Sequence, residues 1–171
     1  MKKSIILLFL SIFFVGNISA AEDKKSNIES IFYSGFKTIN GFSSIGVYLR
    51  GTAEDIGLNK EELTNYLRLR FKNSFANMEF KETDFLTIIN ESDEMRSERG
   101  DISITVWTVG DDYPISFHLE ISAGNYSNLG QYKTAILGYS SKSKIQNSVK
   151  ESISTLLDDL AISFFKARGE I

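Results

Sequence analysis

Residues 102–122 read ISITVWTVGDDYPISFHLEIS, and this stretch decides the fold. Aliphatic and aromatic side chains recur at every second position in both halves, at Ile102, Ile104, Val106 and again at Ile115, Phe117, Leu119 and Ile121. A period of two is typical of β-strands with one buried face. Because the turn-forming run Gly110-Asp111-Asp112 separates the halves, they predict an antiparallel hairpin. The face that carries Ser116, His118 and Glu120 is predicted to stay open.

Helical spacing flanks the hairpin on both sides. Residues 60–75 carry apolar side chains every three or four positions behind Asn59, an expected helix cap with Glu62 three residues later. Near the end, residues 148–151 read as a capping box before an apolar stripe at Val149, Ile153, Leu156, Leu157, Leu160 and Phe164. A helix end is expected near Gly169.

The remaining segments complete an α+β fold. Residues 45–50 and 132–139 are predicted strands, 78–82 and 85–90 short extended pieces, and 91–101 an exposed turn. The order strand, helix, strands, helix predicts a two-layer sandwich in which two amphipathic helices cover an antiparallel sheet.

The first residues predict export. Lys2 and Lys3 precede an apolar run over residues 5–15, and small residues follow at Ser19, Ala20 and Ala21. This order is typical of a secretory signal peptide. The run is shorter than the roughly 20 apolar residues that span a bilayer, although an uncleaved anchor is the alternative. We expect a signal peptide at 1–20, an amino-terminal lead-in at 21–40 and a single α+β domain at 41–171, with no stable membrane anchor after cleavage.

The amino-acid composition indicates the cellular compartment of the protein and excludes one class of partner. The chain has no cysteine, which excludes disulfides and, in an exported protein, favours a bacterial periplasm or secretion from a bacterium. Removal of Lys2 and Lys3 leaves 17 basic residues against 22 acidic ones, a net charge of −5. Nucleic-acid-binding domains typically carry a basic footprint instead, so no nucleic-acid partner is expected.

Several motifs resemble a family of small uncharacterised exported bacterial proteins. The run IGLNKEEL at 56–63, followed by Leu67-Arg68-Leu69-Arg70, is similar to a Gly-Leu-Thr turn that starts a Leu-Arg-Leu-Arg helix in that family. Residues 113–120 and 148–165 resemble its second hairpin strand and its closing helix. Arg68 and the run at 73–75 depart from the family pattern. The resemblance covers residues 45–165 and implies export and an α+β fold, but no activity. Separately, the order of the elements resembles the anticodon-binding-like topology of small domains in envelope-assembly proteins, an analogy of fold alone.

The sequence contains only weak candidates for a catalytic site. His118 is the only histidine and shares its strand face with Glu120, a pair that could bind a metal or relay protons. The alternative is a solvated histidine, because a catalytic zinc site takes three protein ligands. The acidic pairs at 111–112 and 158–159 fall in a turn and on a polar helix side, and neither a nucleophile-elbow nor a phosphate-loop motif occurs. We therefore expect no enzyme, no metal and no cofactor.

The open sheet face is the candidate binding site. Tyr48, Trp107, Val109 and Tyr139 alternate away from the expected core, and exposed aromatic side chains on a sheet can mark a contact surface. Alternatively, residues 28–36 fold over this face. The sequence predicts a periplasmic, non-enzymatic domain that binds another cell-envelope component, a protein or a cell-surface polymer. A carrier of a small ligand or carbohydrate and a hydrolase with an unrecognised site are the alternatives.

Overall fold

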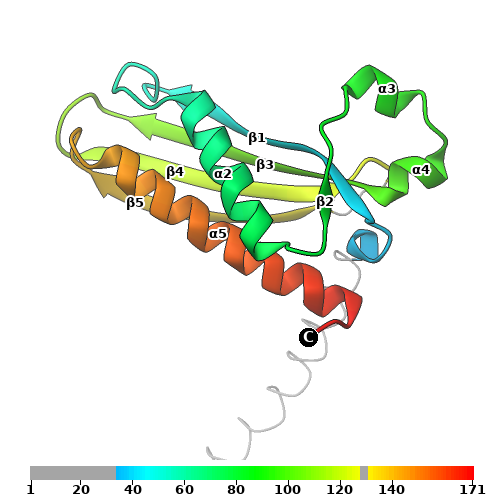
Figure 1. Cartoon of the computed structure of the whole chain (residues 1–171). Helices are drawn as coiled ribbons and strands as arrows, with labels where there is room; N and C mark the ends of the chain where they lie inside the picture. The colour runs from blue at the N-terminus through cyan, green and yellow to red at the C-terminus, as the bar shows by residue number, and fades with distance from the viewer. Residues whose placement is uncertain (1–33, 128–130) are drawn as a thin grey trace, which may run out of the picture.

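The computed structural model describes residues 34–127 and 131–171 and shows an α+β fold of two layers (Figure 1). The expected signal peptide and residues 21–33 of the lead-in lie outside these ranges. Along the chain the elements are η1 Ser34–Lys37, β1 Gly41–Gly51, α2 Lys60–Ser74, β2 Glu79–Phe80, α3 Phe85–Ile89, α4 Asp93–Glu98, β3 Arg99–Val109, β4 Ile115–Asn125, β5 Tyr132–Ser140 and α5 Ile145–Arg168. The five strands form one sheet in the order β2-β1-β3-β4-β5.

The predicted hairpin is confirmed. β3 and β4 pair antiparallel with Ile104 opposite Ile121 and Val106 opposite Leu119, and all four side chains are buried. β5 adds a further antiparallel strand in which Ile136 lies opposite Leu119. The aliphatic face of the hairpin is therefore the core face, as the alternation requires.

The prediction of an antiparallel sheet is wrong for β1. β1 runs parallel to both of its neighbours, β2 and β3, so the sheet is mixed. The reason lies in the connections, because parallel neighbours need a crossover and α2 supplies it between β1 and β2. The segment that carries α3 and α4 then returns the chain to the start of β3 (Figure 1).

The two amphipathic helices cover one face of the sheet, as predicted (Figure 1). In α2 the Asn59 side chain accepts a hydrogen bond from the backbone N–H of Glu62, which confirms the expected cap. The apolar stripe of α5 is buried along its length, and Gly169 ends the helix at φ +73°. The capping box at 148–151 is wrong, since α5 begins at Ile145. Ile145 stands four residues before Val149 and extends the same buried stripe, so burial favours the earlier start.

Between β2 and β3 the sequence prediction also fails. The expected extended piece at 85–90 is helix α3, and the expected turn at 91–101 contains α4 and the start of β3. Each short helix has a side-chain cap that the apolar pattern does not reveal. Asp84 accepts a hydrogen bond from the backbone N–H of Thr87, and Ser92 accepts one from Met95.

No helix within residues 34–127 and 131–171 is long and apolar enough to cross a bilayer.

Candidate functional site

The face of the sheet opposite α2 and α5 carries the candidate binding site. Its large apolar side chains are well exposed, at 45% for Tyr48, 51% for Trp107, 73% for Val109, 81% for Leu137 and 72% for Tyr139. Isolated exposed apolar residues are ordinary, but a contiguous group is typical of an interaction surface.

Strand pairing brings most of these side chains together at one end of the sheet. Trp107 on β3 lies opposite His118 on β4, and His118 lies opposite Leu137 on β5. The next row toward the β3–β4 turn places Val109 opposite Ser116 and Ser116 opposite Tyr139. We call Trp107, Val109, His118, Leu137 and Tyr139 the open-face patch.

Tyr48 belongs to the neighbouring row rather than to the patch. It pairs with Thr105, one row away from Trp107 and on the diagonal from it. The ammonium group of Lys60, at the start of α2, lies 5.5 Å from the Tyr48 ring centroid. A cation over an aromatic face is favourable, so Lys60 and Tyr48 form a border of the patch with a positive charge.

The centre of the patch is a pair of flat rings. The Trp107 and His118 ring centroids lie 6.0 Å apart with an angle of 28° between the ring planes. The sequence places His118 on the open face and suggests a metal ligand, a proton relay or a solvated side chain, but it does not predict that His118 packs on Trp107. Glu120 does not pair with His118, since its carboxylate lies 3.9 Å from the Lys133 ammonium group.

Leu137 is the other residue that the sequence analysis missed. Residues 132–139 are apolar or small at nearly every position, so alternation does not say which side chains face the helices. The register with β4 supplies the answer, because His118 already has a known face and Leu137 lies opposite it.

The expected lead-in bears on whether this face is free. Phe36 packs with its ring centroid 5.2 Å from that of Phe164 on α5, which places it on the helix side of the sheet. Phe36 and Ile39 are part of the buried core. Residues 28–33 lie outside the described ranges, so the alternative that they cover the open face stays a prediction.

The far end of the open face is polar. Asp101 on β3 lies next to Ser44 on β1 and Gly124 on β4. Burial raises the pKa of the Asp101 carboxyl to about 6. Burial, followed by the charge of Asp101, also raises the pKa of the Tyr126 phenol to about 12. This end of the face therefore carries buried polar groups, Asp101 and Tyr126, and differs in chemistry from the patch.

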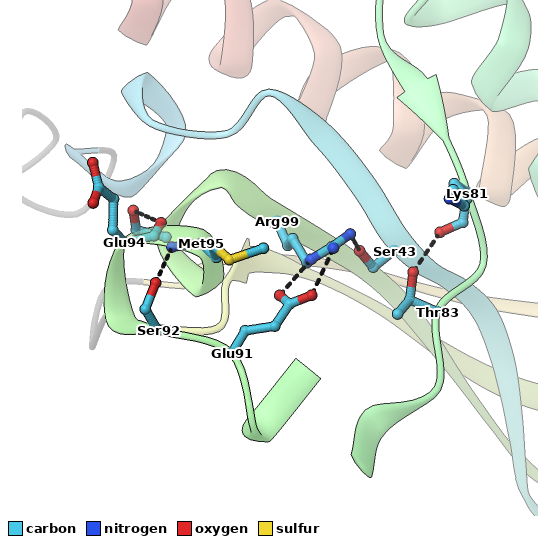
Figure 2. Close-up of polar contacts among 9 residues, drawn as sticks. Ser43, Lys81, Thr83, Glu91, Ser92, Glu94, Met95 and Arg99 are labelled. Atoms are coloured by element: carbon cyan, nitrogen blue, oxygen red, sulfur yellow. Dashed lines mark hydrogen bonds and ion pairs between the residues drawn. The ribbon is translucent and has the colours of Figure 1, made fainter. Parts of the chain in front are cut away.

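A separate cavity of about 240 Å³ lies where β1 and β3 begin, near β2 and α4. Arg99 is one of its lining residues, and Figure 2 shows how the guanidinium is held. Its Nε and one terminal nitrogen each donate to the Glu91 carboxylate at 2.6 Å, and the other terminal nitrogen donates to Ser43 Oγ at 3.3 Å. The hydrogen bonds to Glu91 raise the pKa of Arg99. Because these bonds occupy the guanidinium, Arg99 anchors the α3–α4 segment to the sheet rather than offering a charge to a ligand.

Within the two described ranges, no three His, Cys, Asp or Glu side chains lie close enough together to hold a metal ion.

Comparison with known proteins gives remote structural similarity only. No family model matches the chain, and no curated protein matches its sequence. Among solved structures, an uncharacterised protein matches at 10% identity with a TM-score of 0.47, covering 72% of this chain and 91% of its own. A PelC dodecamer from Paraburkholderia phytofirmans matches at 8% identity with a TM-score of 0.49, covering 72% of this chain and 89% of its own. These likenesses assign the chain to no family, so the family resemblance expected from the sequence stays a prediction.

Proposed function

We propose that this protein is an exported, non-enzymatic domain of the bacterial cell envelope that binds another envelope component, a protein or a cell-surface polymer, through the open-face patch. The observation that carries the proposal is the exposure of Trp107, Leu137 and Tyr139 side by side on a sheet face that the helices leave bare. Export rests on the signal-peptide pattern of residues 1–20 and places the protein in the periplasm or outside the cell.

The shape of the patch favours a large partner over a small ligand. Small-molecule sites are concave and bury most of the ligand, so their wall residues are largely covered. Leu137 and Tyr139 instead expose most of their surface. The cavity at the start of β1 and β3 is lined by other residues, Arg99 among them. A small-ligand or carbohydrate carrier is therefore the weaker proposal.

A hydrolase is also less well supported. A nucleophilic site needs a base within hydrogen-bonding reach of both a nucleophile and an orienting carboxylate. His118 stacks on Trp107, and the nearby Glu120 carboxylate faces Lys133. These contacts suit a binding surface in which His118 widens the flat face that Trp107 presents.

Site-specific photocrosslinking in the producing cells tests the proposal. A photoreactive residue at Val109 is compared with one at Leu69, which is similarly exposed but lies on α2. We expect an adduct of defined mass from Val109 and none from Leu69. Mass analysis of the adduct then distinguishes a protein partner from a polymer.

The Trp107→Ala variant supplies the second half of the test. Truncation of an aromatic anchor typically costs about 2 kcal/mol or more of binding free energy, so the Val109 adduct should be largely lost while the variant still folds. Equal adducts from Val109 and Leu69, or an unchanged Val109 adduct in Trp107→Ala, would contradict the proposal. A Trp107→Ala protein that melts far below the wild type would show that Trp107 serves the core instead.

A further inference from the structure

The two edges of the sheet differ in how their backbone groups are satisfied. Past the two-residue strand β2, the free edge of β1 is closed by α2. Thr64 Oγ1 accepts from the Val47 backbone N–H at 3.2 Å, and Arg68 Nε donates to the Ile45 carbonyl at 3.1 Å. At the other edge, the outward backbone groups of residues 133–139 on β5 have no hydrogen-bond partner among the described residues. An open strand edge is a template for pairing with another strand.

β5 also lacks the features that normally prevent such pairing. Edge strands are usually short, charged, interrupted by proline or distorted by a bulge. β5 is nine residues long, keeps a regular register with β4 throughout, contains no proline and has Lys133 as its one charged residue. Its exposed side chains include Leu137 and Tyr139, two of the most exposed large apolar residues described.

We infer that β5 pairs antiparallel with β5 of a second copy, so that the two sheets join into one. In such a pair, opposite residues must lie on the same face, and the register of full overlap centres on Ile136. Ala135 then lies opposite the partner's Leu137 on the open face. This inference does not depend on the proposed function, because it concerns the strand edge and not the partner of the open-face patch.

The strand is complementary to itself in this register, which is why a second copy fits better than an unrelated strand. The strand has no acidic residue, and its single Lys133 meets the partner's Tyr139, a favourable cation–aromatic pair, rather than another lysine. On the helix side Thr134 meets the partner's Gly138. Gly138 has no side chain because a Cβ there would lie 2.4 Å from the Phe117 ring, and this leaves room for the threonine.

The size of the contact predicts a dimer that responds to concentration. A stable interface of standard size uses about 20 to 30 residues on each side, more than the nine of β5. We therefore expect the mass measured by light scattering to rise from one chain toward two as the purified protein is concentrated. A wild-type mass of one chain across the whole soluble range would overturn the inference.

Two double variants test the register with matched controls. Ala135→Lys with Leu137→Lys places lysines opposite each other twice, and like charges directly opposite destabilise strand pairs. Ala135→Lys with Leu137→Glu adds as many charged side chains but places Lys opposite the partner's Glu, and it keeps the same Ala135→Lys change opposite Glu120 of its own chain. Both positions are exposed, so the fold of the single chain should persist in both variants. We expect the first variant to stay monomeric and the second to dimerise, whereas monomers for both would refute the pairing.

A crosslink at the centre of the strand provides an independent measurement. Because the chain has no cysteine, Ile136→Cys introduces the sole thiol, and the proposed register brings it opposite the partner's own. Mild oxidation should give a covalent dimer from Ile136→Cys and far less from Leu69→Cys, an exposed control on α2. Equal yields of covalent dimer from the two variants would show that the crosslinks form by random collision, and would overturn the inference.

Discussion

Replacing Asn125 by alanine should destabilise the fold far more than its place at the end of a strand suggests. Asn125 is 4% exposed, and its side-chain amide donates to the carbonyls of Gly35 and Ser97 at 3.3 and 3.2 Å and to Thr38 Oγ1 at 3.1 Å. It thereby joins β4 to η1, to Thr38 just after η1, and to α4. In the alanine variant the two carbonyls and the Thr38 hydroxyl lose the hydrogen bonds from the Asn125 amide.

The magnitude follows from counting donors. The Thr38 hydroxyl lies 3.0 Å from the Gly35 carbonyl and 2.8 Å from the Ser97 carbonyl, but its single hydrogen can serve only one of them. Asn125→Ala therefore leaves either the carbonyl of buried Gly35 or that of half-buried Ser97 without a donor, at a cost of about 1–3 kcal/mol. Thr38→Val should cost less, because the two amide hydrogens of Asn125 can then serve both carbonyls.

A double-mutant cycle gives the sharpest measurement. In Thr38→Val with Asn125→Ala both carbonyls lack a donor, so the loss of unfolding free energy should exceed the sum of the single losses by about 0.5 kcal/mol or more. Urea unfolding of the four proteins measures this. Asn90→Ala is the control, since Asn90 is exposed and its amide donates only to the Leu86 carbonyl. Additive losses, or a loss for Asn125→Ala no larger than for Asn90→Ala, would refute the reasoning.

Three further predictions concern the core, the polar end of the open face and the β4–β5 contact. Leu157→Ala should cost about 2–5 kcal/mol in denaturant unfolding because Leu157 is fully buried, whereas Lys150→Ala, which breaks one exposed ion pair with Glu62, should shift the midpoint far less. The pKa of Asp101 is raised to about 6 in the folded state, so the free energy of unfolding of the wild type should fall as pH rises from about 4 to 6. The expected fall is about 1–2 kcal/mol, because Asp101 keeps partial contact with solvent. Thermal melts across this pH range should show that Asp101→Asn removes the fall. Gly138→Ala should destabilise by about 1–3 kcal/mol in thermal unfolding, because its Cβ would overlap the Phe117 ring.

Local periodicity was enough to predict the hairpin and both long helices. In each case the deciding information lies within about 20 residues, such as the alternation of Ile104 and Val106 or the spacing of Val149 and Ile153. The direction of β1 was not predictable in this way. Whether β1 runs parallel or antiparallel to β3 depends on the connection between them, which contains α2, β2, α3 and α4. The short helices α3 and α4 have caps but no apolar stripe, so the sequence pattern does not reveal this connection.

In the candidate site, too, some residues could be predicted from local alternation and others could not. Trp107 and Val109 could be assigned to the open face because they share a strand with a clear alternation. Leu137 could not, since β5 has no clear alternation and its register with β4 decides its face. The roles of Asp101 and Asn125 could not be predicted from local sequence. Burial raises the pKa of Asp101 and makes Asn125 a structural residue, and this burial exists only in the assembled fold.

The two proposals meet at Leu137 and Tyr139, which belong both to the open-face patch and to the free strand β5. A two-fold axis that joins two β5 strands keeps the open faces on the same side, so a dimer would carry two patches on one continuous surface. A partner made of repeating units could engage both patches, and linked sites of this kind gain roughly 10²–10⁴ in apparent affinity over one site. A partner with a single binding epitope gains nothing from the second patch. Comparing single-repeat and multi-repeat fragments of a polymer partner on the wild-type protein would therefore show a steep gain with length if the dimer presents both patches, and a flat response would show that each patch binds alone.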